Sequence, residues 1–264
     1  MVDTDATRMI MGIVGNVISF FLFISPLPTI WKIFKSKSVQ EFRPDPYVAT
    51  TLNCAMWVFY GLPFIHPDNL LVLTINGAGL IIELIYVFVF LSFSAWPLRR
   101  KIIIALVIEA IFFVGLACIT LTILHTTKTR SKLVGGFGVF FNIIMYISPL
   151  TVMRMVIKRK SVKYMPFYLA VANFANGSIW LAYALLKIDL FLAVPNGLGT
   201  LSGLIQLILY VIYYKTTKWE EEEEEDDGNN NNNNNEKPSE ESPDDVQVQQ
   251  TPPSTVPPAE IKQP

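Results

Sequence analysis

Seven apolar stretches, each long enough to cross a lipid bilayer, constrain the fold of this chain more than any other feature. The hydrocarbon core of a bilayer is about 30 Å thick, so a helix that crosses it needs roughly 20 consecutive apolar residues. The stretches cover residues 9–31, 46–65, 70–92, 102–124, 133–157, 166–186 and 190–214. The sequence therefore predicts an all-α integral membrane protein with seven transmembrane helices.

The basic residues are distributed unevenly among the loops between these stretches. The first, third and fifth loops, together with Lys215 and Lys218, hold 14 Lys and Arg, whereas the N-terminus and the other three loops hold 5. Cytoplasmic loops carry the excess of positive charge, so we expect an extracellular N-terminus and a cytoplasmic C-terminus. The basic clusters are short and are not interleaved with aromatic residues, which argues against a nucleic-acid partner.

The composition changes abruptly after residue 215. Residues 220–225 are all Glu, residues 229–235 are all Asn, and Pro, Ser and Gln follow. Residues 216–264 contain 14 acidic and 3 basic residues. Because such a segment cannot bury enough apolar surface to fold, we expect a disordered, acidic and Asn-rich cytoplasmic tail.

An internal repeat relates the two ends of the apolar region. The segment ISPL occurs twice, 123 residues apart, and KSKSV returns at the same offset as KRKSV. The offset then falls to 120, because Asn76 reappears as Asn196. Residues 1–92 and 133–215 are therefore expected to be two parallel three-helix repeats, and residues 93–132 a linker helix that restores the orientation of the second repeat. This is a three, one, three architecture.

Several segments of the chain resemble plant SWEET sugar transporters, and the resemblance covers residues 8–216. The segments are ISPLP, TLNCAMWVFYGLP, TINGAGLIIELIY, ANGSIWLAYAL and PNGLGTLSGLIQLILY. The chain is most similar to the plant group associated with hexose movement. The resemblance implies a bidirectional facilitative transporter (uniporter) of the plasma membrane that moves a neutral hexose, glucose above all, by alternating access. It implies no enzymatic activity and no cofactor; the partners would be the sugar, the lipid bilayer and, in a homo-oligomer, further copies of the chain.

Asparagine and tryptophan residues recur at matching positions of the two repeats. An amide in hydrocarbon is costly unless it is hydrogen-bonded, so polar residues within spans face the bundle or a watery cavity. Asn offers donors and an acceptor without charge, which suits sugar hydroxyls, and an indole could pack on the apolar face of a pyranose. The expected substrate-binding residues are Trp57, Asn76, Trp180, Asn196, Asn53 and Asn176. The alternative is that these side chains only join helices to one another.

The resemblance also implies roles for further positions. In related members, pocket size is set at the positions that match Ser19, Leu22, Asn142 and Met145, together with Asn53 and Asn176. Leu22 and Met145 are bulky, which favours a monosaccharide. The four hinge prolines of the family match Pro26, Pro46, Pro149 and Pro166. Pro46 and Pro166 could instead simply begin helices.

A gate at the extracellular side is expected from three residues near the outer ends of their stretches. Tyr60 is followed by Gly61, and Asp189 lies in the loop before the last stretch. A hydrogen bond from the phenol to the carboxylate would help to close that side.

The sequence offers neither a metal site nor a reaction centre. His66 and His125 lie in loops, and no spacing of His, Cys, Asp and Glu suits a metal ion. Glu83 and Glu109 are the carboxylates within the apolar stretches, but neither has a counterpart in the other repeat, so a packing role is favoured for both. The alternatives to a uniporter are a proton-coupled carrier of another small solute on the same fold and, less well supported, a seven-helix receptor.

Overall fold

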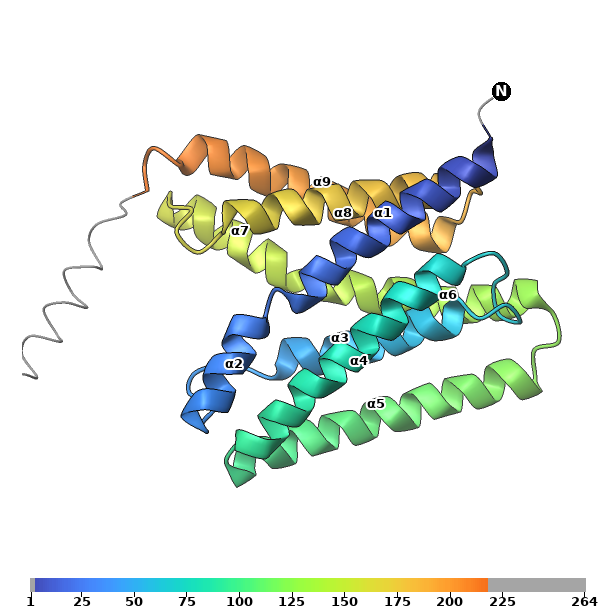
Figure 1. Cartoon of the computed structure of the whole chain (residues 1–264), viewed down its shortest axis with the longest axis horizontal. Coiled ribbons are helices and arrows are strands. Elements are labelled where there is room, and N and C mark those ends of the chain that lie inside the picture. Colours follow the sequence, from blue (N-terminus) through green and yellow to red (C-terminus); the bar gives the residue numbers. More distant parts are fainter. Residues whose placement is uncertain (1–2, 218–264) are drawn as a thin grey trace, which may run out of the picture. The chain divides into compact units, whose positions relative to one another are not determined.

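The structure, a computed structural model, describes residues 3–217. Within these residues the chain forms α-helices joined by short loops, with no β-strand (Figure 1). The helices are α1 (Thr4–Ile24), α2 (Leu27–Ser36), α3 (Asp45–Tyr60), α4 (Leu70–Phe93), α5 (Trp96–Thr122), α6 (Thr127–Met145), α7 (Ile147–Arg159), α8 (Phe167–Leu185) and α9 (Leu190–Tyr213). The tail expected over residues 216–264 lies outside the described residues, apart from its first two.

The first span of each repeat is divided into two helices. The stretch expected over residues 9–31 is interrupted between α1 and α2, where Pro26 precedes α2 and cannot donate a backbone hydrogen bond. The stretch expected over 133–157 is interrupted at Tyr146, between α6 and α7. Both short helices, α2 and α7, are followed by a lysine in the left-handed conformation, Lys37 with φ 55° and Lys160 with φ 50°. These lysines are 123 residues apart, so the sequence repeat reappears in the backbone.

Between residues 3 and 217 the chain forms the seven helical segments expected of this architecture, and five of these are long and apolar enough to cross a membrane. Those five are α1 with α2, α4, α5, α6 with α7, and α9. The remaining two are α3 and α8. Helix α3 has 16 residues rather than the 20 expected, because the chain turns at Gly61 and Pro63. Helix α8 has 19 residues and carries Asn173 and Asn176.

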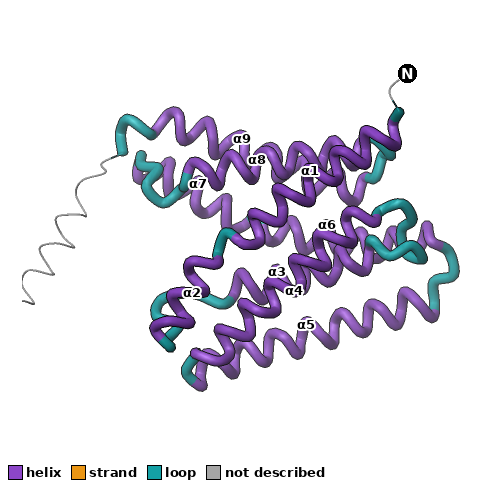
Figure 2. Tube along the Cα trace, in the orientation of Figure 1, coloured by secondary structure: helices purple, strands orange, loops and turns teal. Residues whose placement is uncertain are grey.

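The helices of the two repeats are interleaved. Helix α1 packs on α4 and α8, and α6 packs on α9 and α3. The first helix of each repeat therefore contacts the third helix of its own repeat and the second helix of the other. The linker helix α5 packs on α3, α4 and α6, and Figure 2 shows it running beside α3 and α4.

The apolar core differs between the two ends of the bundle. We call the end at which α1 begins the N-terminal end. There, one large cluster joins both repeats, and it includes Tyr60 and Trp57 of α3 and Tyr183 and Trp180 of α8. At the opposite end each repeat has a cluster of its own, one under α2 around Ile33 and another under α7. The repeats are thus packed together at the N-terminal end and separately packed at the opposite end.

Large apolar side chains also cover the outside of the bundle. Phe88, Ile111 and Val211 are each more than two-thirds exposed, and many other Ile, Leu, Val and Phe side chains are half exposed. Apolar surface on this scale is unfavourable in water and marks a surface that contacts a membrane or a partner. Here it agrees with the lengths of the helices, so lipid would cover it.

Candidate binding site

A cavity of about 420 Å³ lies between the two repeats. Eighteen of its nineteen lining residues form nine pairs whose members are 123 or 120 positions apart. The pairs are Ser19 with Asn142, Leu22 with Met145, Phe23 with Tyr146, Thr50 with Asn173, Asn53 with Asn176, Trp57 with Trp180, Val72 with Leu192, Ile75 with Pro195 and Asn76 with Asn196. The nineteenth residue is Glu83. The cavity therefore has an approximate twofold symmetry that follows directly from the sequence repeat.

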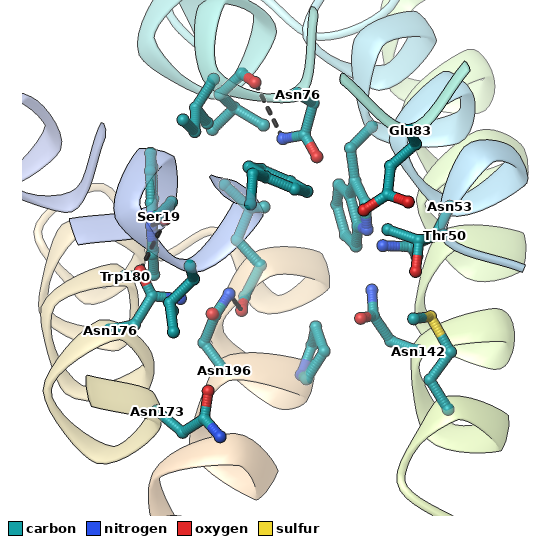
Figure 3. Close-up of a pocket in the computed structure, with 18 of the residues that line it drawn as sticks. Ser19, Thr50, Asn53, Asn76, Glu83, Asn142, Asn173, Asn176, Trp180 and Asn196 are labelled. Atoms are coloured by element: carbon teal, nitrogen blue, oxygen red, sulfur yellow. Dashed lines mark hydrogen bonds between the residues drawn. The ribbon is translucent and has the colours of Figure 1, made fainter. Parts of the chain in front are cut away.

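The structure brings together all ten residues that the sequence analysis assigned to substrate binding or pocket size. It adds Glu83 and four further pairs, of which Thr50 with Asn173 is the pair that brings a hydroxyl and an amide. These lie three positions before Asn53 and Asn176, one helical turn away on the same face (Figure 3). The combination of helical spacing and the 123-residue offset would have identified them.

Asn76 and Asn196 have matching hydrogen bonds. Nδ2 of Asn76 donates to the carbonyl oxygen of Val72 at 2.9 Å, and Nδ2 of Asn196 donates to that of Leu192 at 2.8 Å. Each bond lies within the residue's own helix and uses one of the two amide hydrogens. Each amide therefore keeps its oxygen and one N–H for a ligand, and Figure 3 shows both residues at the cavity.

The second asparagine pair is used differently in the two repeats. Asn176 Oδ1 accepts a hydrogen bond from Ser19 Oγ at 2.6 Å, and Trp180 Nε1 donates to the same hydroxyl at 3.0 Å. This chain joins α8 to α1 across the repeats. In the first repeat, Asn53 Oδ1 is buried and has no hydrogen-bond partner among residues 3–217. The amide of Asn53 is thus more available to a ligand than that of Asn176.

The two indoles lie where the cavity meets the large apolar cluster of the N-terminal end, and 5% of Trp57 and 6% of Trp180 are exposed. Each indole packs against a glycine of the other repeat. A Cβ atom at Gly15 would lie 2.9 Å from the Trp180 ring, and one at Gly138 would lie 3.2 Å from the Trp57 ring. Gly15 and Gly138 are 123 residues apart, so the absence of a side chain at both positions lets each ring cross the interface between the repeats.

The prolines expected to act as hinges lie at helix junctions. Pro26 immediately precedes α2, and Pro149 is in the first turn of α7, so both mark the interruptions described above. Pro46 is in the first turn of α3 and Pro166 immediately precedes α8. Of the two interpretations left open for Pro46 and Pro166, the structure places both residues where helices begin.

Tyr60 and Asp189 meet at the N-terminal end of the bundle. Tyr60 Oη donates to Asp189 Oδ1 at 2.9 Å, and Asn69 Nδ2 donates to Oδ2 of the same carboxylate at 3.2 Å. Asp189 is 5% exposed and also caps α9, because Oδ1 accepts from the backbone N–H groups of Phe191 and Leu192. Gly61, beside Tyr60, packs against the backbone of Leu73, where a Cβ atom would be 3.0 Å from the Leu73 nitrogen.

Arg8 takes part in this closure, although the sequence analysis counted it only as an N-terminal charge. Its guanidinium donates to Asn69 Oδ1 and to the carbonyl oxygen of Asp68, both at 2.7 Å. It also lies over the ring of Tyr183, 4.0 Å from the ring centre. Arg8 is buried and joins α1 to the α3–α4 loop and to α8. Nothing in its sequence context distinguishes it from an exposed flanking charge.

His66 is a second residue whose position the sequence did not reveal. Its ring stacks on Tyr60 with centres 4.7 Å apart, Nε2 lies 3.4 Å from Asp189 Oδ2, and Nδ1 lies 2.9 Å from Ser131 Oγ. Burial lowers the pKa of His66 below its ordinary value near 6.5, and Arg8 acts in the same direction, whereas the charges of Asp189 and Asp68 oppose the shift. The structure therefore favours the neutral ring.

We expect acidification to loosen the N-terminal end. The lowered pKa of His66 means that the closed arrangement binds a proton less tightly than a state in which the ring is solvated. Closure is therefore most stable above the ordinary pKa and weakens as the pH falls through it. A Val72→Cys variant without Cys54 and Cys118 should react faster with an impermeant maleimide, added on the side of the N-terminus, when the pH there falls from about 7.5 to about 5.5.

The labelling rates are to be normalised to those of an exposed cysteine at each pH, because the thiol itself titrates. His66→Gln should remove most of the remaining pH dependence, whereas His125→Gln, a change at the only other histidine of the chain, should preserve it. Equal pH dependence in both variants would exclude His66 as the group responsible.

Glu83 differs from the expectation of a helix-packing role. It is 5% exposed, it lines the cavity, and its Oε2 has no hydrogen-bond partner in the part of the chain that the structure describes. Glu109, the other carboxyl group of the apolar stretches, instead lines a separate cavity of about 230 Å³ between α3 and α5, near Asp45 and Lys101. Among residues 3–217, no group of three or more His, Cys, Asp or Glu is placed to hold a metal ion.

Comparisons with known proteins agree with these observations. A family model described as "Sugar efflux transporter for intercellular exchange" matches residues 9–97 and 132–218. Two proteins of Arabidopsis thaliana, the bidirectional sugar transporters SWEET5 and SWEET4, are 62% and 57% identical to this chain, with matches that cover 82% of it and 90% and 86% of the respective relatives. The solved structure of a eukaryotic SWEET transporter is 36% identical, with a TM-score of 0.77, and the match covers 80% of this chain and 99% of that one.

Proposed function

We propose, from the premise that this chain belongs to the SWEET family of sugar transporters, that it moves a neutral hexose, glucose above all, in either direction across the membrane. The chain is a multi-pass membrane protein and a transporter rather than an enzyme. The observation that carries the hexose proposal is the cavity between the repeats. Its polar lining consists mainly of uncharged amides in matched pairs. Such groups suit a neutral ligand with several hydroxyl groups.

The proposed substrate-binding residues divide into amides and rings. Asn76 and Asn196, with their free oxygens, bond the hydroxyl groups of the sugar, and Asn53 adds a further unpaired oxygen. Trp57 and Trp180 present apolar ring surface to its C–H faces at the closed end of the cavity. Asn176 acts mainly through Ser19 and Trp180, which it holds in place.

Movement of the sugar requires the two ends of the bundle to open in turn. The arrangement described here is closed at the N-terminal end, where Tyr60, Asp189 and Arg8 join the repeats. At the opposite end α2 packs on α4 and α7 packs on α9, each within its own repeat. The interruptions at Pro26 and Pro149 allow α2 and α7 to swing together as short units and close that end. Uniport needs no further energy source, because the sugar gradient sets the direction of net movement.

We place the N-terminal end outside the cell and the protein in the plasma membrane. The orientation rests on the sequence count of loop charges, because the first, third and fifth loops with Lys215 and Lys218 hold 14 Lys and Arg, and the N-terminus with the other three loops holds 5. In this orientation the end at which the repeats are packed separately faces the cytoplasm. A reporter fused to the N-terminus should be accessible from outside intact cells.

Shortening the two bulky residues of the cavity should admit a larger sugar. Leu22 and Met145 are a matched pair on α1 and α6, and replacement of both by Val removes volume from both halves of the cavity at once. The Leu22→Val/Met145→Val double variant should therefore transport sucrose at several times the background rate while keeping glucose transport. Radiolabelled uptake of the two sugars at matched surface amounts measures the change.

A suitable control is Met9→Val/Leu150→Val, which shortens residues of the same types that face outward and are more than half exposed. This control should still exclude sucrose. Continued exclusion of sucrose by the cavity variant would show that Leu22 and Met145 do not set the size limit.

The test of the proposed function is uptake and efflux of labelled glucose in a cell that lacks other hexose transporters, with sucrose in parallel. We expect flux in both directions that follows the glucose gradient and persists when an uncoupler removes the proton gradient. A requirement for the proton gradient would favour the coupled carrier, for which the cavity carboxyl of Glu83 is the specific observation. Absence of glucose flux despite surface expression would contradict the hexose proposal.

A further inference from the structure

One residue of the cavity has no positional counterpart in the other repeat. Eighteen lining residues are matched between the repeats, and Glu83 of α4 is not. A pyranose has no twofold symmetry of its own. In a cavity whose lining is matched by position, the two opposite orientations of the sugar differ only through pairs of unlike residues and through Glu83. A carboxyl group present on one side alone is the strongest of these differences.

The carboxyl group of Glu83 is buried and incompletely hydrogen-bonded. The residue is 5% exposed, and Oε2 has no partner within the described residues. Asn53 Oδ1, another lining atom of the same repeat, is also buried and unpaired. Figure 3 shows Glu83 on the same side of the cavity as Thr50 and Asn53. Two buried, unpaired acceptors thus belong to residues that line the same side of the cavity, where hydroxyl donors of a bound sugar would satisfy them.

An ion pair does not account for the carboxyl group. None of the described residues that line the cavity is Lys, Arg or His. Buried polar groups in native structures nearly always have a partner, and an unpaired one calls for an explanation such as a ligand. A sugar hydroxyl is a donor of the right kind, so binding would supply the bond that the protein itself leaves unmade.

The packing of α8 on α9 keeps the asymmetry in place. The counterpart of Glu83, 120 positions later, is Gly203. A Cβ atom at Gly203 would lie 2.8 Å from the Cα atom of Phe174 on α8, a distance at which something must shift. The second repeat therefore has no room for a matching side chain, and the carboxyl group can act only from the side of the first repeat.

We propose that Glu83 is a further sugar-binding residue: its carboxyl group accepts a hydrogen bond from one hydroxyl of the sugar and so fixes which way round the sugar lies between the matched halves. This inference rests on the proposed function, and it adds a binding residue and an orientation to the same site. The contact is to one hydroxyl, so its loss affects sugars that carry that hydroxyl and leaves those that lack it unaffected.

The experiment compares wild type with Glu83→Met and Glu83→Gln in the hexose-transport-deficient cell, at matched surface amounts. Uptake is measured over a range of glucose concentrations and, at low concentration, for the four monodeoxyglucoses that lack the 2-, 3-, 4- or 6-hydroxyl. Met has a similar length but no acceptor for this bond. Gln keeps an acceptor, and its similar shape makes it the variant that should fold like wild type. Glu109→Met is the matched control, because Glu109 is the other intramembrane carboxyl and lies outside this cavity.

Glu83→Met should raise the half-saturating glucose concentration about tenfold, as expected for loss of one hydrogen bond to a carboxyl group. One deoxyglucose should be about tenfold poorer than glucose for wild type but equal to glucose for Glu83→Met. Glu83→Gln should keep the wild-type order of preference with a smaller rise in the half-saturating concentration, and Glu109→Met should behave as wild type.

An unchanged order of preference in Glu83→Met would overturn the proposal, because a merely structural residue would not alter discrimination at a single hydroxyl. The proposal would also be overturned if both Glu83→Gln and Glu109→Met failed to distinguish glucose from the deoxyglucose that wild type disfavours. A wild-type protein that moves none of these sugars would instead contradict the proposed function, and this inference with it.

Discussion

Replacement of Asn76 or Asn196 by Ala is expected to reduce glucose transport about tenfold or more. Each amide offers the cavity one oxygen and one N–H, and two hydrogen bonds of about 0.5–1.5 kcal/mol each account for that loss. The fold should tolerate both changes, because the only hydrogen bond that either side chain makes within the described residues is to its own helix. The backbone carbonyl oxygen that loses this bond still has its helical partner.

The measurement is the concentration dependence of labelled-glucose uptake, with the amount at the cell surface determined by biotinylation. Gln206→Ala is the matched control, since Gln206 is an amide on the same helix as Asn196 that lies outside the cavity, and its one side-chain hydrogen bond within the described residues is to Ser202. This control should transport at close to the wild-type rate. Wild-type kinetics in both asparagine variants would remove these residues from the binding site.

The sequence predicts the fold and much of the cavity because both depend on patterns that repeat along the chain. Length and apolarity locate the spans, and the 123-residue offset relates Trp57 to Trp180 without any knowledge of contacts. Two residues related by the repeat must occupy equivalent places in the fold. A polar pair within spans is therefore expected at the interface between the repeats, where the structure places Asn76 and Asn196.

Apart from the hydrogen bond between Tyr60 and Asp189, which the sequence suggested, the closed N-terminal end could not be predicted in the same way, because its contacts are not duplicated. Arg8, His66 and Asn69 come from α1 and from the α3–α4 loop. The polar side chains of short loops are usually solvated, so nothing in the sequence shows that these are buried. Only the approach of the two repeats, itself a result of the packing around Trp57 and Trp180, brings them together.

The break after α1 shows another limit of sequence patterns. Pro26 occurs inside an apolar run, and hydropathy alone extends the helix through it. The helix stops because proline has no N–H to donate and its ring disfavours a continuous helix. The matching break at Tyr146 occurs three residues before Pro149, so the same residue type interrupts the two repeats at slightly different places.

The two ends of the bundle differ in what joins the repeats. At the N-terminal end, the large apolar cluster is supplemented by charged and hydrogen-bonded groups that water can solvate when the repeats separate. At the opposite end, the described arrangement has one apolar cluster per repeat and none that joins them. Single substitutions of polar residues should therefore change the free energy of closure more at the N-terminal end than at the opposite end.

Asp189→Ala is expected to abolish most transport by preventing stable closure of the N-terminal end. It removes the acceptor for Tyr60 and Asn69, each bond to a charged group contributing about 1.5–3 kcal/mol. When this end opens, water can satisfy those donors, so the loss falls on the closed state. A shift of about 3 kcal/mol changes the closed-to-open ratio roughly a hundredfold, which disturbs any cycle that needs both states.

The effects of milder substitutions on transport and closure should increase with the number of hydrogen bonds that they remove. Tyr60→Phe removes one hydrogen bond and should have the smallest effect of the series. Asp189→Asn keeps an acceptor oxygen and a good cap for α9, but it turns an N–H towards a neighbouring donor, so its effect should be intermediate. Glucose flux and maleimide labelling of Val72→Cys from the side of the N-terminus measure transport and closure separately.

Asp68→Asn is the control for loss of an acidic group at the same end. The carboxylate of Asp68 is exposed and contacts Lys187 at 3.3 Å, and Asn tolerates the left-handed backbone of this position, where φ is 64°. The Asp68→Asn variant should transport glucose at the normal rate, and its Val72→Cys form should react slowly with maleimide. The Asp189 variants should lose glucose flux, and their Val72→Cys forms should react fast. If flux fell while labelling stayed slow in Asp189→Ala, the carboxylate would act on a step other than closure, and the assignment of Tyr60 and Asp189 as a gate would be wrong.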